Sequence, residues 1–319
     1  MIYGCVPPLS EQAAIVRFLH HADRRIRRYV RAKQKLIKLL EEQKQAITHR
    51  AVTRGLYETV RLEASGVEWL GAVPEHWEVV PNKAVCRLAT GHTPSRKVPE
   101  YWNGCDISWF TLSDVHQIRG DKTKYVYETQ EKVSELGIAN SSAVKLPRGT
   151  VILSRTASVG WSAILGCEMA TSQDFMAWIP GHRVSSEYLL VTLRAMRPTF
   201  RQLMHGSTHQ TIYMPTLHGF RMPLPPLEEQ AAIAEYVDIA SRRIDNARVC
   251  AVEEIDLLRE YRTRLIADVV TGKLDVREAA ARLPDETAEP GPLDEPEAEG
   301  DAEDHEDNDV ADVPEEVEA

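Results

Sequence analysis

Three short polar segments of the sequence carry side chains that could contact nucleic acid. Residues 90–97 (TGHTPSRK), 154–160 (SRTASVG) and 206–211 (GSTHQT) combine small turn-forming residues with hydroxyl groups and with Arg, Lys, His or Gln. Hydroxyl groups and backbone amides contact phosphates, whereas Arg, Gln and His side chains reach base edges. We predict DNA contacts at Ser95, Arg96, Lys97, Arg119, Arg155, His209 and Gln210. Taken singly, each segment is also typical of an ordinary surface turn.

No catalytic motif accompanies these segments. The sequence lacks the glycine-rich phosphate loops and the H-E-x-x-H zinc motif, and neither of its Pro-Pro pairs follows the Asp or Asn of an amino-methyltransferase. Asp174 is a lone acid, and no Cys or Ser is spaced from a loop histidine in the way that indicates a catalytic nucleophile and its base. The five cysteines are scattered without the spacing of a metal site or a disulfide framework. We therefore expect a binding protein that is not an enzyme and holds no metal or cofactor itself.

The polar segments belong to a region, residues 57–224, with frequent turn residues and short apolar runs. These runs predict strands at 77–80, 107–110, 150–154, 162–165 and 175–179, and the leucine spacing after Ser185 predicts a helix at 186–196. Trp102, Trp109 and Trp178 are expected in the core. The region is predicted to form one α+β domain.

The sequence repeats itself on both sides of this region, at an offset of 218 residues. Residues 7–15 (PPLSEQAAI) recur as 225–233 (PPLEEQAAI), and the match continues without a gap to Leu56 and Leu274. Apolar residues in each copy recur at alternating steps of four and three, the pattern of a coiled-coil seam. The predicted seam passes through Ile15, Ile26, Tyr29, Lys33, Leu36 and Gln43 in the first copy, and through Ile233, Ile244, Ala247, Glu254 and Tyr261 in the second.

Each copy therefore predicts a helix of about 43 residues, ended by Gly55 and by Gly272. The first copy is basic and the second slightly acidic, so we expect the helices to pair antiparallel. The predicted domains are the first helix at 1–56, the globular domain at 57–224, the second helix at 225–283 and a tail at 284–319. Arg24, Arg25, Arg242 and Arg243 are candidates for partner docking, although solvated helix faces also carry such residues.

The net charge of −10 is an average over unlike parts of the chain. Residues 284–319 contain 17 acidic and no basic residues, which leaves about +7 on the rest. Such an acidic, proline-containing tail is predicted to be disordered, and the mildly basic body is compatible with DNA binding. Nothing resembles a signal peptide or a membrane span, so a cytoplasmic location is expected.

In the order of these features, the sequence resembles the specificity subunit of type I restriction–modification systems. The resemblance covers about residues 2–276. It is carried by PPLEEQ at 225–230, its partner at Pro7 and, between them, Trp69-Leu70-Gly71, Pro74, Trp77, residues 90–95, Tyr101-Trp102 and residues 206–210. It implies a chain that binds double-stranded DNA and directs methyltransferase subunits and a translocating restriction subunit to a split target. Those partners would bring S-adenosylmethionine, ATP and magnesium.

The sequence departs from the family plan because it contains one recognition domain where two are usual. A half-length subunit that forms a homodimer would restore two domains, and its target would then be palindromic. A truncated, non-functional specificity subunit is the other interpretation. Outside this family, a coiled-coil scaffold whose middle domain binds protein is the alternative, and a free-standing nuclease or methyltransferase is disfavoured by the missing motifs.

Overall fold

A computed structural model describes residues 7–57, 59–204 and 211–284 of the chain. It contains two compact units. The central unit comprises Tyr29–Leu258, and the terminal unit comprises Met1–Arg28 together with Arg259–Ala319. The predicted domain boundaries stay predictions, and the predicted disordered tail lies, after Pro284, outside the described residues.

Two long helices run through the fold, as the repeat predicts. α1 spans Leu9–Arg54 and α6 spans Leu227–Val270, with 46 and 44 residues. Both follow a Pro-Pro pair, and both end where a glycine adopts a left-handed backbone, Gly55 with φ 71° and Gly272 with φ 74°. A residue with a Cβ resists this conformation, so the two glycines are the helix terminators that the sequence indicates.

A five-stranded sheet of order β4-β11-β8-β9-β6 forms the middle of the central unit. Its strands are β4 (Cys86–Thr90), β6 (Tyr125–Val126), β8 (Val151–Ser154), β9 (Ser162–Leu165) and β11 (Phe175–Pro180). Smaller sheets pair β1 (Leu62–Ala64) with β2 (Ala72–Pro74), β3 (Glu78–Pro81) with β12 (Arg221–Leu224), and β5 (Ile107–Phe110) with β7 (Glu131–Val133) and β10 (Ala170–Thr171). The short helices are α2 (Glu135–Ala139), α3 (Ser186–Ala195), α4 (Arg197–Gln202), α5 (Met214–Gly219) and α7 (Arg277–Ala281). The 3-10 helices are η1 (Asn82–Ala84), η2 (Pro99–Trp102), η3 (Leu112–Gln117) and η4 (Arg119–Asp121).

Both faces of the five-stranded sheet are buried. Along β11, Met176 and Trp178 enter one apolar cluster, whereas Phe175 and Ala177 enter a second on the opposite face. Such alternation is what a strand with a period of two residues produces. Trp109 and Trp178 are core residues, as expected, and Trp102 is half-buried.

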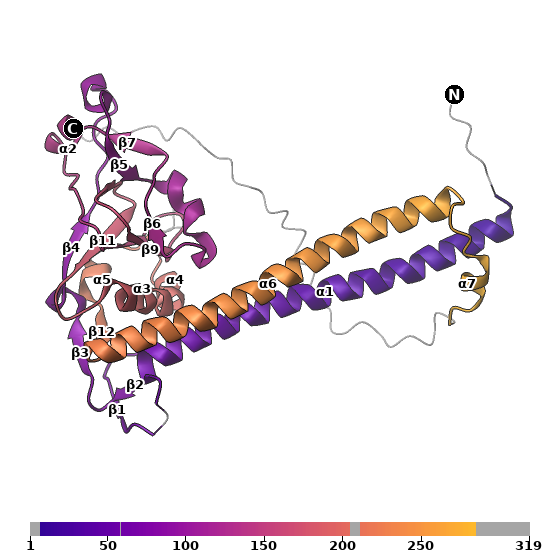
Figure 1. The fold of residues 1–319 in the computed structure, drawn as a ribbon, viewed down its shortest axis with the longest axis horizontal. Coiled ribbons are helices and arrows are strands. Elements are labelled where there is room, and N and C mark those ends of the chain that lie inside the picture. Colours follow the sequence, from indigo (N-terminus) through magenta and orange to yellow (C-terminus); the bar gives the residue numbers. More distant parts are fainter. Residues whose placement is uncertain (1–6, 58, 205–210, 285–319) are drawn as a thin grey trace. The chain divides into compact units, whose positions relative to one another are not determined.

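Helix α3 joins the sheet to the long helices (Figure 1). Its buried side chains share an apolar cluster with Ala51 and Val52 near the end of α1, and with Ile233 and Val237 near the start of α6. The described part of residues 57–224, the predicted recognition region, is therefore packed on both long helices. The predicted α+β fold with a sheet domain beside two long helices is confirmed.

Within the central unit, α1 and α6 run antiparallel. Lys33 of α1 pairs with Glu254 of α6, and Lys44 with Asp245, 2.8 Å apart. The predicted seam is wrong at alternate positions, because Tyr29, Leu36 and Gln43 are exposed in α1, as are Ala247, Glu254 and Tyr261 in α6. The residue that directly follows each of them is half-buried or buried instead. These residues are Val30, Ile37 and Lys44 in α1, and Arg248, Ile255 and Arg262 in α6.

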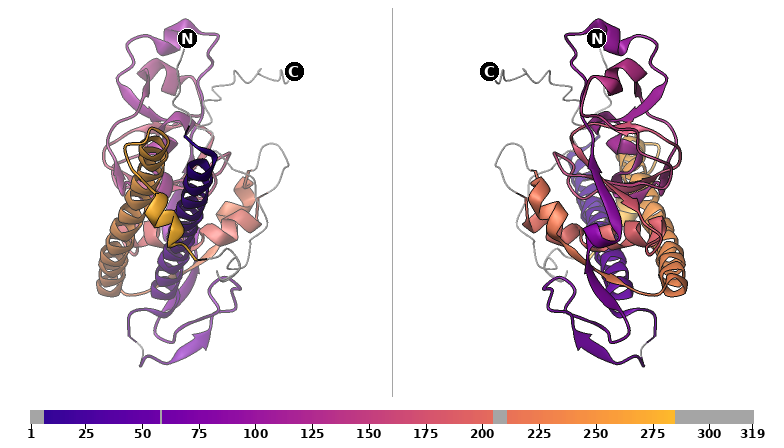
Figure 2. Two further views of the ribbon diagram at one scale, coloured as in Figure 1. Left: turned by 90° about the vertical axis from the view of Figure 1, so that its right-hand side faces the viewer. Right: turned by 90° about the vertical axis from the view of Figure 1, so that its left-hand side faces the viewer.

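The terminal unit contains the start of α1, the end of α6 and α7. Leu265, Val269 and Val276 are buried, and partly buried apolar residues of α1, including Ile15 and Leu19, pack against them. Arg262 of α6 donates to Asp23 of α1. Figure 2 shows α7 next to the ends of the two long helices.

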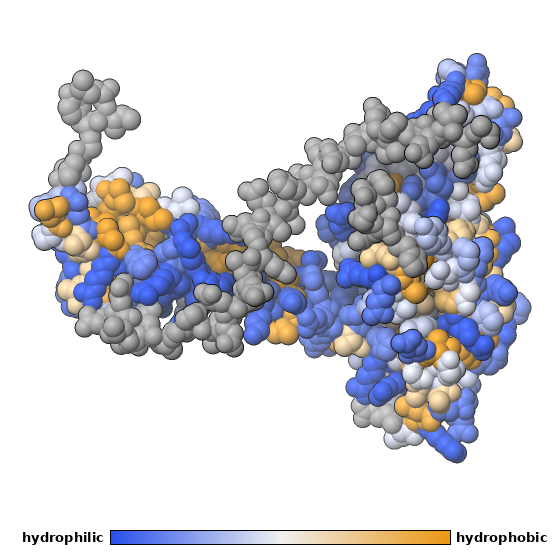
Figure 3. Space-filling model, turned by 180° about the vertical axis from the view of Figure 1, so that it is seen from behind, coloured by the Kyte–Doolittle hydropathy of each residue, from blue (hydrophilic) through white to orange (hydrophobic). Residues whose placement is uncertain are grey.

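Most of the visible surface is hydrophilic, but apolar residues also appear on the long helices (Figure 3). In the terminal unit, Leu9 and Val16 of α1 are 83% and 66% exposed. Across residues 7–57, 59–204 and 211–284, no helix combines the length and apolar character that crossing a bilayer requires.

Candidate nucleic-acid interface

Two of the three polar segments meet at one end of the five-stranded sheet. β4 ends at Thr90, β8 ends at Ser154 and β11 begins at Phe175. In the antiparallel register, Phe175 lies opposite Ser154, and Met176 lies opposite Thr90. The loops that follow β4 and β8 therefore leave the sheet on the same side as the loop that precedes β11.

Hydrogen bonds join these loops through residues 172–174. Arg155 donates from Nε to the carbonyl oxygen of Gln173 over 2.9 Å, and its backbone N–H donates to the carbonyl of Asp174 over 2.9 Å. Thr93 donates from Oγ1 to Oε1 of Gln173 over 2.6 Å. Gln173 thus connects the segment around Thr93 with the segment around Arg155.

The described end of the third polar segment belongs to the same cluster. Thr211 forms an isolated β-bridge with Thr156, and the N–H of Ile212 donates to the carbonyl of Arg155 over 2.9 Å. His209 and Gln210, two of the predicted DNA contacts, lie outside the described residues.

Arg119 joins the cluster from another part of the chain. Its Nη2 donates to Oγ of Ser158 over 3.1 Å, so the 3-10 helix η4, which begins at Arg119, touches the loop that carries Arg155. Among the described residues, the two that combine a side chain with a positive φ are Asp121, with φ 59°, and Ala157, with φ 57°. Both lie beside this contact, in a conformation that costs an ordinary residue roughly 1 kcal/mol or more.

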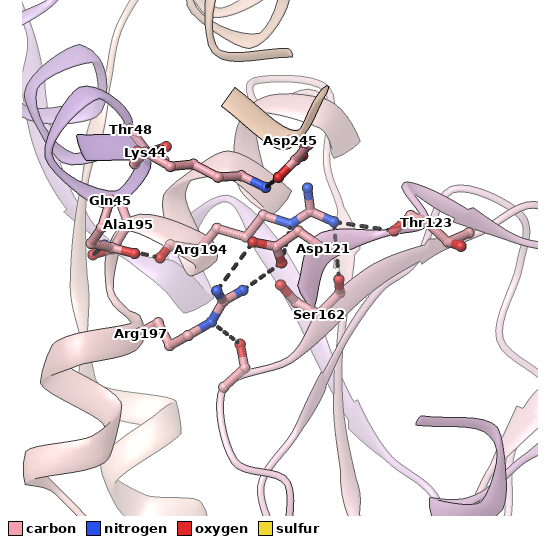
Figure 4. A network of polar contacts seen from close by, with 11 residues as sticks. Lys44, Gln45, Thr48, Asp121, Thr123, Ser162, Arg194, Ala195, Arg197 and Asp245 are labelled. Carbon is pink, nitrogen blue, oxygen red and sulfur yellow. Dashed lines mark hydrogen bonds and ion pairs between the residues drawn. The ribbon is translucent and has the colours of Figure 1, made fainter. Parts of the chain in front are cut away.

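A buried ion network holds the Arg119 segment on α3 and α4. Figure 4 shows the side chains of Arg194 and Arg197 turned toward Asp121. Arg197 donates from Nη2 and Nη1 to the two carboxylate oxygens over 2.5 and 3.1 Å, and Arg194 Nε lies 3.2 Å from Oδ1. The side chains are only 8% exposed for Asp121, 17% for Arg194 and 11% for Arg197, so the charges are held largely away from water.

Burial and the arginines act in opposite directions on Asp121. Burial raises the pKa of the Asp121 carboxyl, but the positive charges of Arg194 and Arg197 and the hydrogen bonds from Arg197 outweigh it, so the net shift is downward. Burial also lowers the pKa of the Arg194 guanidinium despite the opposing charge of Asp121. The network is stable only with both signs of charge present.

The same network reaches the long helices. Gln45 of α1 donates to the carbonyl oxygens of Arg194 and Ala195, over 3.3 and 2.9 Å, at the carboxyl end of α3. Lys44, the neighbour of Gln45, pairs with Asp245 of α6. The position of η4, which carries Arg119, is therefore linked through α3 to both long helices.

Arg96 has a structural role that the sequence did not indicate. Its guanidinium donates to Glu131 over 2.8 Å and lies 4.2 Å from the ring centroid of Trp102, a cation–π arrangement. Ser95 and Lys97, on either side of Arg96, are exposed at the surface of the same segment. The DNA contacts at Ser95, Arg96 and Lys97 stay predictions.

The arginines predicted to dock partners lie in different surroundings. Arg24 is half-buried and Arg25 is exposed, both in the part of α1 that belongs to the terminal unit. Arg242 and Arg243 are exposed on α6 in the central unit, where Arg242 pairs with Asp238 one helical turn away. Their role in docking stays a prediction.

The repeated Pro-Pro motif contains the residue that fastens the recognition region to α6. Gln230 is fully buried, and its Nε2 donates to the carbonyl oxygens of Pro225 and Arg183, each over 2.9 Å. Its Oε1 accepts the backbone N–H of Ser185, the residue that caps the start of α3, over 2.9 Å. In the first copy of the repeat, Gln12 makes the equivalent bond to the carbonyl of Pro7, over 2.8 Å.

Replacing Gln230 by alanine is expected to lower the free energy of unfolding by about 2–3 kcal/mol, because buried backbone groups of three residues lose their partner. Gln12→Ala is the matched control, since Gln12 is only half-buried, and we expect a loss of about 1 kcal/mol or less. Urea unfolding of the full chain measures both changes. Equal losses for the two variants would show that Gln230 does not fasten the domain.

Gln173 and Thr93 are members of the cluster that are not among the predicted DNA contacts, although Thr93 lies in the predicted segment 90–97. Ser172, Gln173 and Asp174 form a polar triplet between two buried strands, a pattern that could have indicated a functional loop. Within the described ranges, no group of three or more His, Cys, Asp or Glu side chains is arranged to hold a metal ion.

Comparison with known sequences identifies the type of domain. The sequence model of the type I restriction modification DNA specificity domain matches residues 74–253, more than half of the chain. The MjaIX specificity subunit of a type I restriction enzyme of Methanocaldococcus jannaschii is 32% identical over 181 residues, which cover 56% of this chain and 41% of that protein. The MjaVIII specificity subunit of the same organism is 23% identical over 285 residues, 85% of this chain and 62% of that one.

Solved structures show the same fold. A chain from a study of complex assembly in the type I R-M system superposes with a TM-score of 0.64 at 21% identity, covering 84% of this chain and 61% of that one. The HsdS subunit of Thermoanaerobacter tengcongensis gives a TM-score of 0.51 at 21% identity, covering 84% and 60%. This chain spans about two-fifths to three-fifths of the length of these relatives. The protein belongs to the family of the type I restriction modification DNA specificity domain.

Proposed function

We propose that this protein is a non-catalytic, sequence-specific DNA-binding subunit of a type I restriction–modification complex. Its recognition region binds one part of a split site in double-stranded DNA. The observation that carries the proposal is the convergence of the polar loops at one end of the sheet, joined by Thr93, Arg155 and Gln173. Such a surface offers both phosphate-binding and base-reading groups.

Methyltransferase subunits and a translocating restriction subunit are the proposed protein partners, in the cytoplasm. S-adenosylmethionine, ATP and magnesium then belong to those partners. The long helices are the proposed docking surface, because they carry exposed apolar residues such as Leu39 and Leu257 as well as the arginines at 242 and 243.

The internal repeat supports a place for a second recognition domain at the start of α1. In the second copy of the repeat, Ala234 and Val237 are 5% exposed, because the recognition region covers them. Of the equivalent residues in the first copy, Val16 is 66% exposed, whereas Leu19 is half-buried because it packs against Leu265, Val269 and Val276. Val16 therefore marks the surface that lacks the cover of the second copy. The occupant that fits is therefore another recognition domain.

A second copy of this chain and a separate polypeptide are two sources of that domain, and the mass of the complex distinguishes them. Light scattering is measured on the purified chain, alone and with its methyltransferase partner. Two copies per complex support a homodimer with a symmetric target. A complex with one copy of the chain, whose mass increases only when a separate recognition domain is added, supports the second source. A complex with one copy that binds no such domain contradicts the place proposed for a second recognition domain.

Two variants distinguish phosphate contacts from base contacts. Lys97→Ala is expected to weaken the binding of all duplexes alike. It should also reduce the slope of log K against the logarithm of the salt concentration by about one. Arg155→Ala is expected to relax the preference at one base pair, by about 1–3 kcal/mol. Gel shifts at several salt concentrations, with the assembled subunits and a panel of duplexes, measure both changes.

The alternative outcomes are equally definite. A wild-type complex that binds all duplexes with the same affinity contradicts a specificity subunit. Partner binding without any DNA binding would favour the scaffold protein instead. Unchanged binding in both variants, with a sequence preference in the wild type, would place the interface elsewhere on the chain.

A further inference from the structure

Gln173 has a backbone that is held by the neighbouring loop that carries Arg155 and by a bond within its own loop. It lies in the loop between β10 and β11, and its carbonyl oxygen accepts from Arg155 Nε over 2.9 Å. The next carbonyl, that of Asp174, accepts the N–H of Arg155 over 2.9 Å. Asp174 in turn accepts the hydroxyl of Ser172 through Oδ2 over 2.9 Å. The Cα of Gln173 is therefore fixed although its side chain is exposed.

The carboxamide of Gln173 is also oriented. Thr93 donates from Oγ1 to Gln173 Oε1 over 2.6 Å, which defines the oxygen side of the amide. Thr93 is itself held, because the N–H of His92 donates to the carbonyl of Thr171 over 3.1 Å. Gly91 packs so closely on Thr171 that no side chain would fit between them. An exposed glutamine is usually free to rotate, and ordering it in advance reduces the entropy that binding costs.

An amide held in this way keeps two N–H donors and the second lone pair of its oxygen. A donor beside an acceptor matches the N7 and N6–H₂ groups of adenine in the major groove. Guanine presents two acceptors there and cytosine one donor, so neither pairs with both groups. We infer that Gln173 is a specificity-determining residue that reads an adenine of the target, and that Thr93 is the residue that positions it. The inference rests on the proposed function.

The test is a selection of duplexes from a random pool by the full chain bound to its methyltransferase partner, followed by sequencing. The wild type is expected to select a motif that contains an adenine. Gln173→Ala should reduce the preference for that adenine about tenfold or more and leave the other positions unchanged. Gln173→Glu presents acceptors only, so the same position should shift toward cytosine.

Thr93→Val tests the positioning role, because valine keeps the shape of threonine without its hydroxyl. It should relax the same position by a smaller factor, and it should add nothing in the Gln173→Ala background. Gln202→Ala, at an exposed glutamine on α4, is the matched control and should leave the motif unchanged.

The outcomes separate this inference from the proposed function. A wild type that selects no motif overturns the proposed function. A wild type with a motif that Gln173→Ala and Gln173→Glu both retain at full stringency overturns only the inference. Weakening at every position alike, with unchanged melting of the protein, assigns Gln173 to a backbone contact and also overturns it.

Discussion

Replacing Asp121 by asparagine is expected to lower the free energy of unfolding by about 3–5 kcal/mol. The substitution keeps the shape of the side chain but removes the negative charge that faces Arg194 and Arg197. Two largely buried guanidinium groups would then lack their counter-ion, and an uncompensated buried charge costs more than the ion pair itself contributes. Urea unfolding of the full chain, followed by circular dichroism, measures the loss.

Asp238→Asn is the matched control. Asp238 pairs with Arg242 on the surface of α6, with side chains 43% and 69% exposed, so its loss should change stability by no more than about 0.5 kcal/mol. A loss of similar size for both variants would mean that the Asp121 network contributes no more than a surface pair. DNA selection by Asp121→Asn should also be impaired, because Asp121 anchors the 3-10 helix η4, which carries Arg119.

The same carboxyl makes stability depend on pH on the acid side. Burial raises the pKa of Asp121, but the two arginines lower it by more than burial raises it. The pKa in the folded state therefore lies below the ordinary value of about 3.9. The folded state then binds the proton less tightly than the unfolded state. Its contribution is fully present above pH ~4 and is lost as pH falls through the folded pKa. Asp121→Asn should unfold with a flatter pH dependence in this range than the wild type.

The sequence predicted the framework of this fold well because its signals are local or repeated. The Pro-Pro pairs, the terminal glycines and the long apolar repeat defined α1 and α6, and Ser185 marked the start of α3. The strands at 107–110 and 162–165 have the predicted bounds, because both are short apolar runs between turn residues. These features depend on neighbouring residues, which a sequence displays directly.

The helix seam was predicted only in part because two stripes compete along each helix. After Ile26, both Tyr29 and Val30 continue an apolar pattern, and the choice between them depends on the partner helix. In the structure Val30 is half-buried, whereas Tyr29 is 50% exposed. The polar interruptions Lys33 and Glu254, one in each predicted stripe, pair with each other.

The candidate site was predicted by residue type and not by arrangement. The loops around Arg155 and Thr93 were identified from their composition, but nothing in the sequence connects them to Gln173, which lies 80 residues from Thr93. The ion pair of Arg96 with Glu131 was equally hidden, because it depends on how β7 approaches the loop. Long-range pairs of this kind arise from the fold, so single-sequence patterns do not reveal them.

Gly91→Ala is expected to destabilise the protein by about 3 kcal/mol or more and to abolish DNA selection. A Cβ at this position would lie 1.9 Å from the carbonyl oxygen of Thr171 and 2.3 Å from that of Ser172. Both atoms belong to the backbone, so no side-chain rotation relieves the overlap. The loop after β4 must therefore move away from residues 171–173, which breaks the bond from His92 and separates Thr93 from Gln173.

Gly219→Ala provides the control, because a Cβ there meets no atom within 4 Å and the backbone is not left-handed. Its stability should be unchanged or higher by up to about 1 kcal/mol. Thermal unfolding and duplex selection, measured on both variants and the wild type, decide the matter. If Gly91→Ala unfolded at the same temperature as the wild type and selected the same motif, the loop after β4 would have to be too flexible to hold Thr93 against Gln173. A variant that melts lower and binds duplexes without preference would show that the contact of Gly91 with the β10–β11 loop is what builds the reading surface.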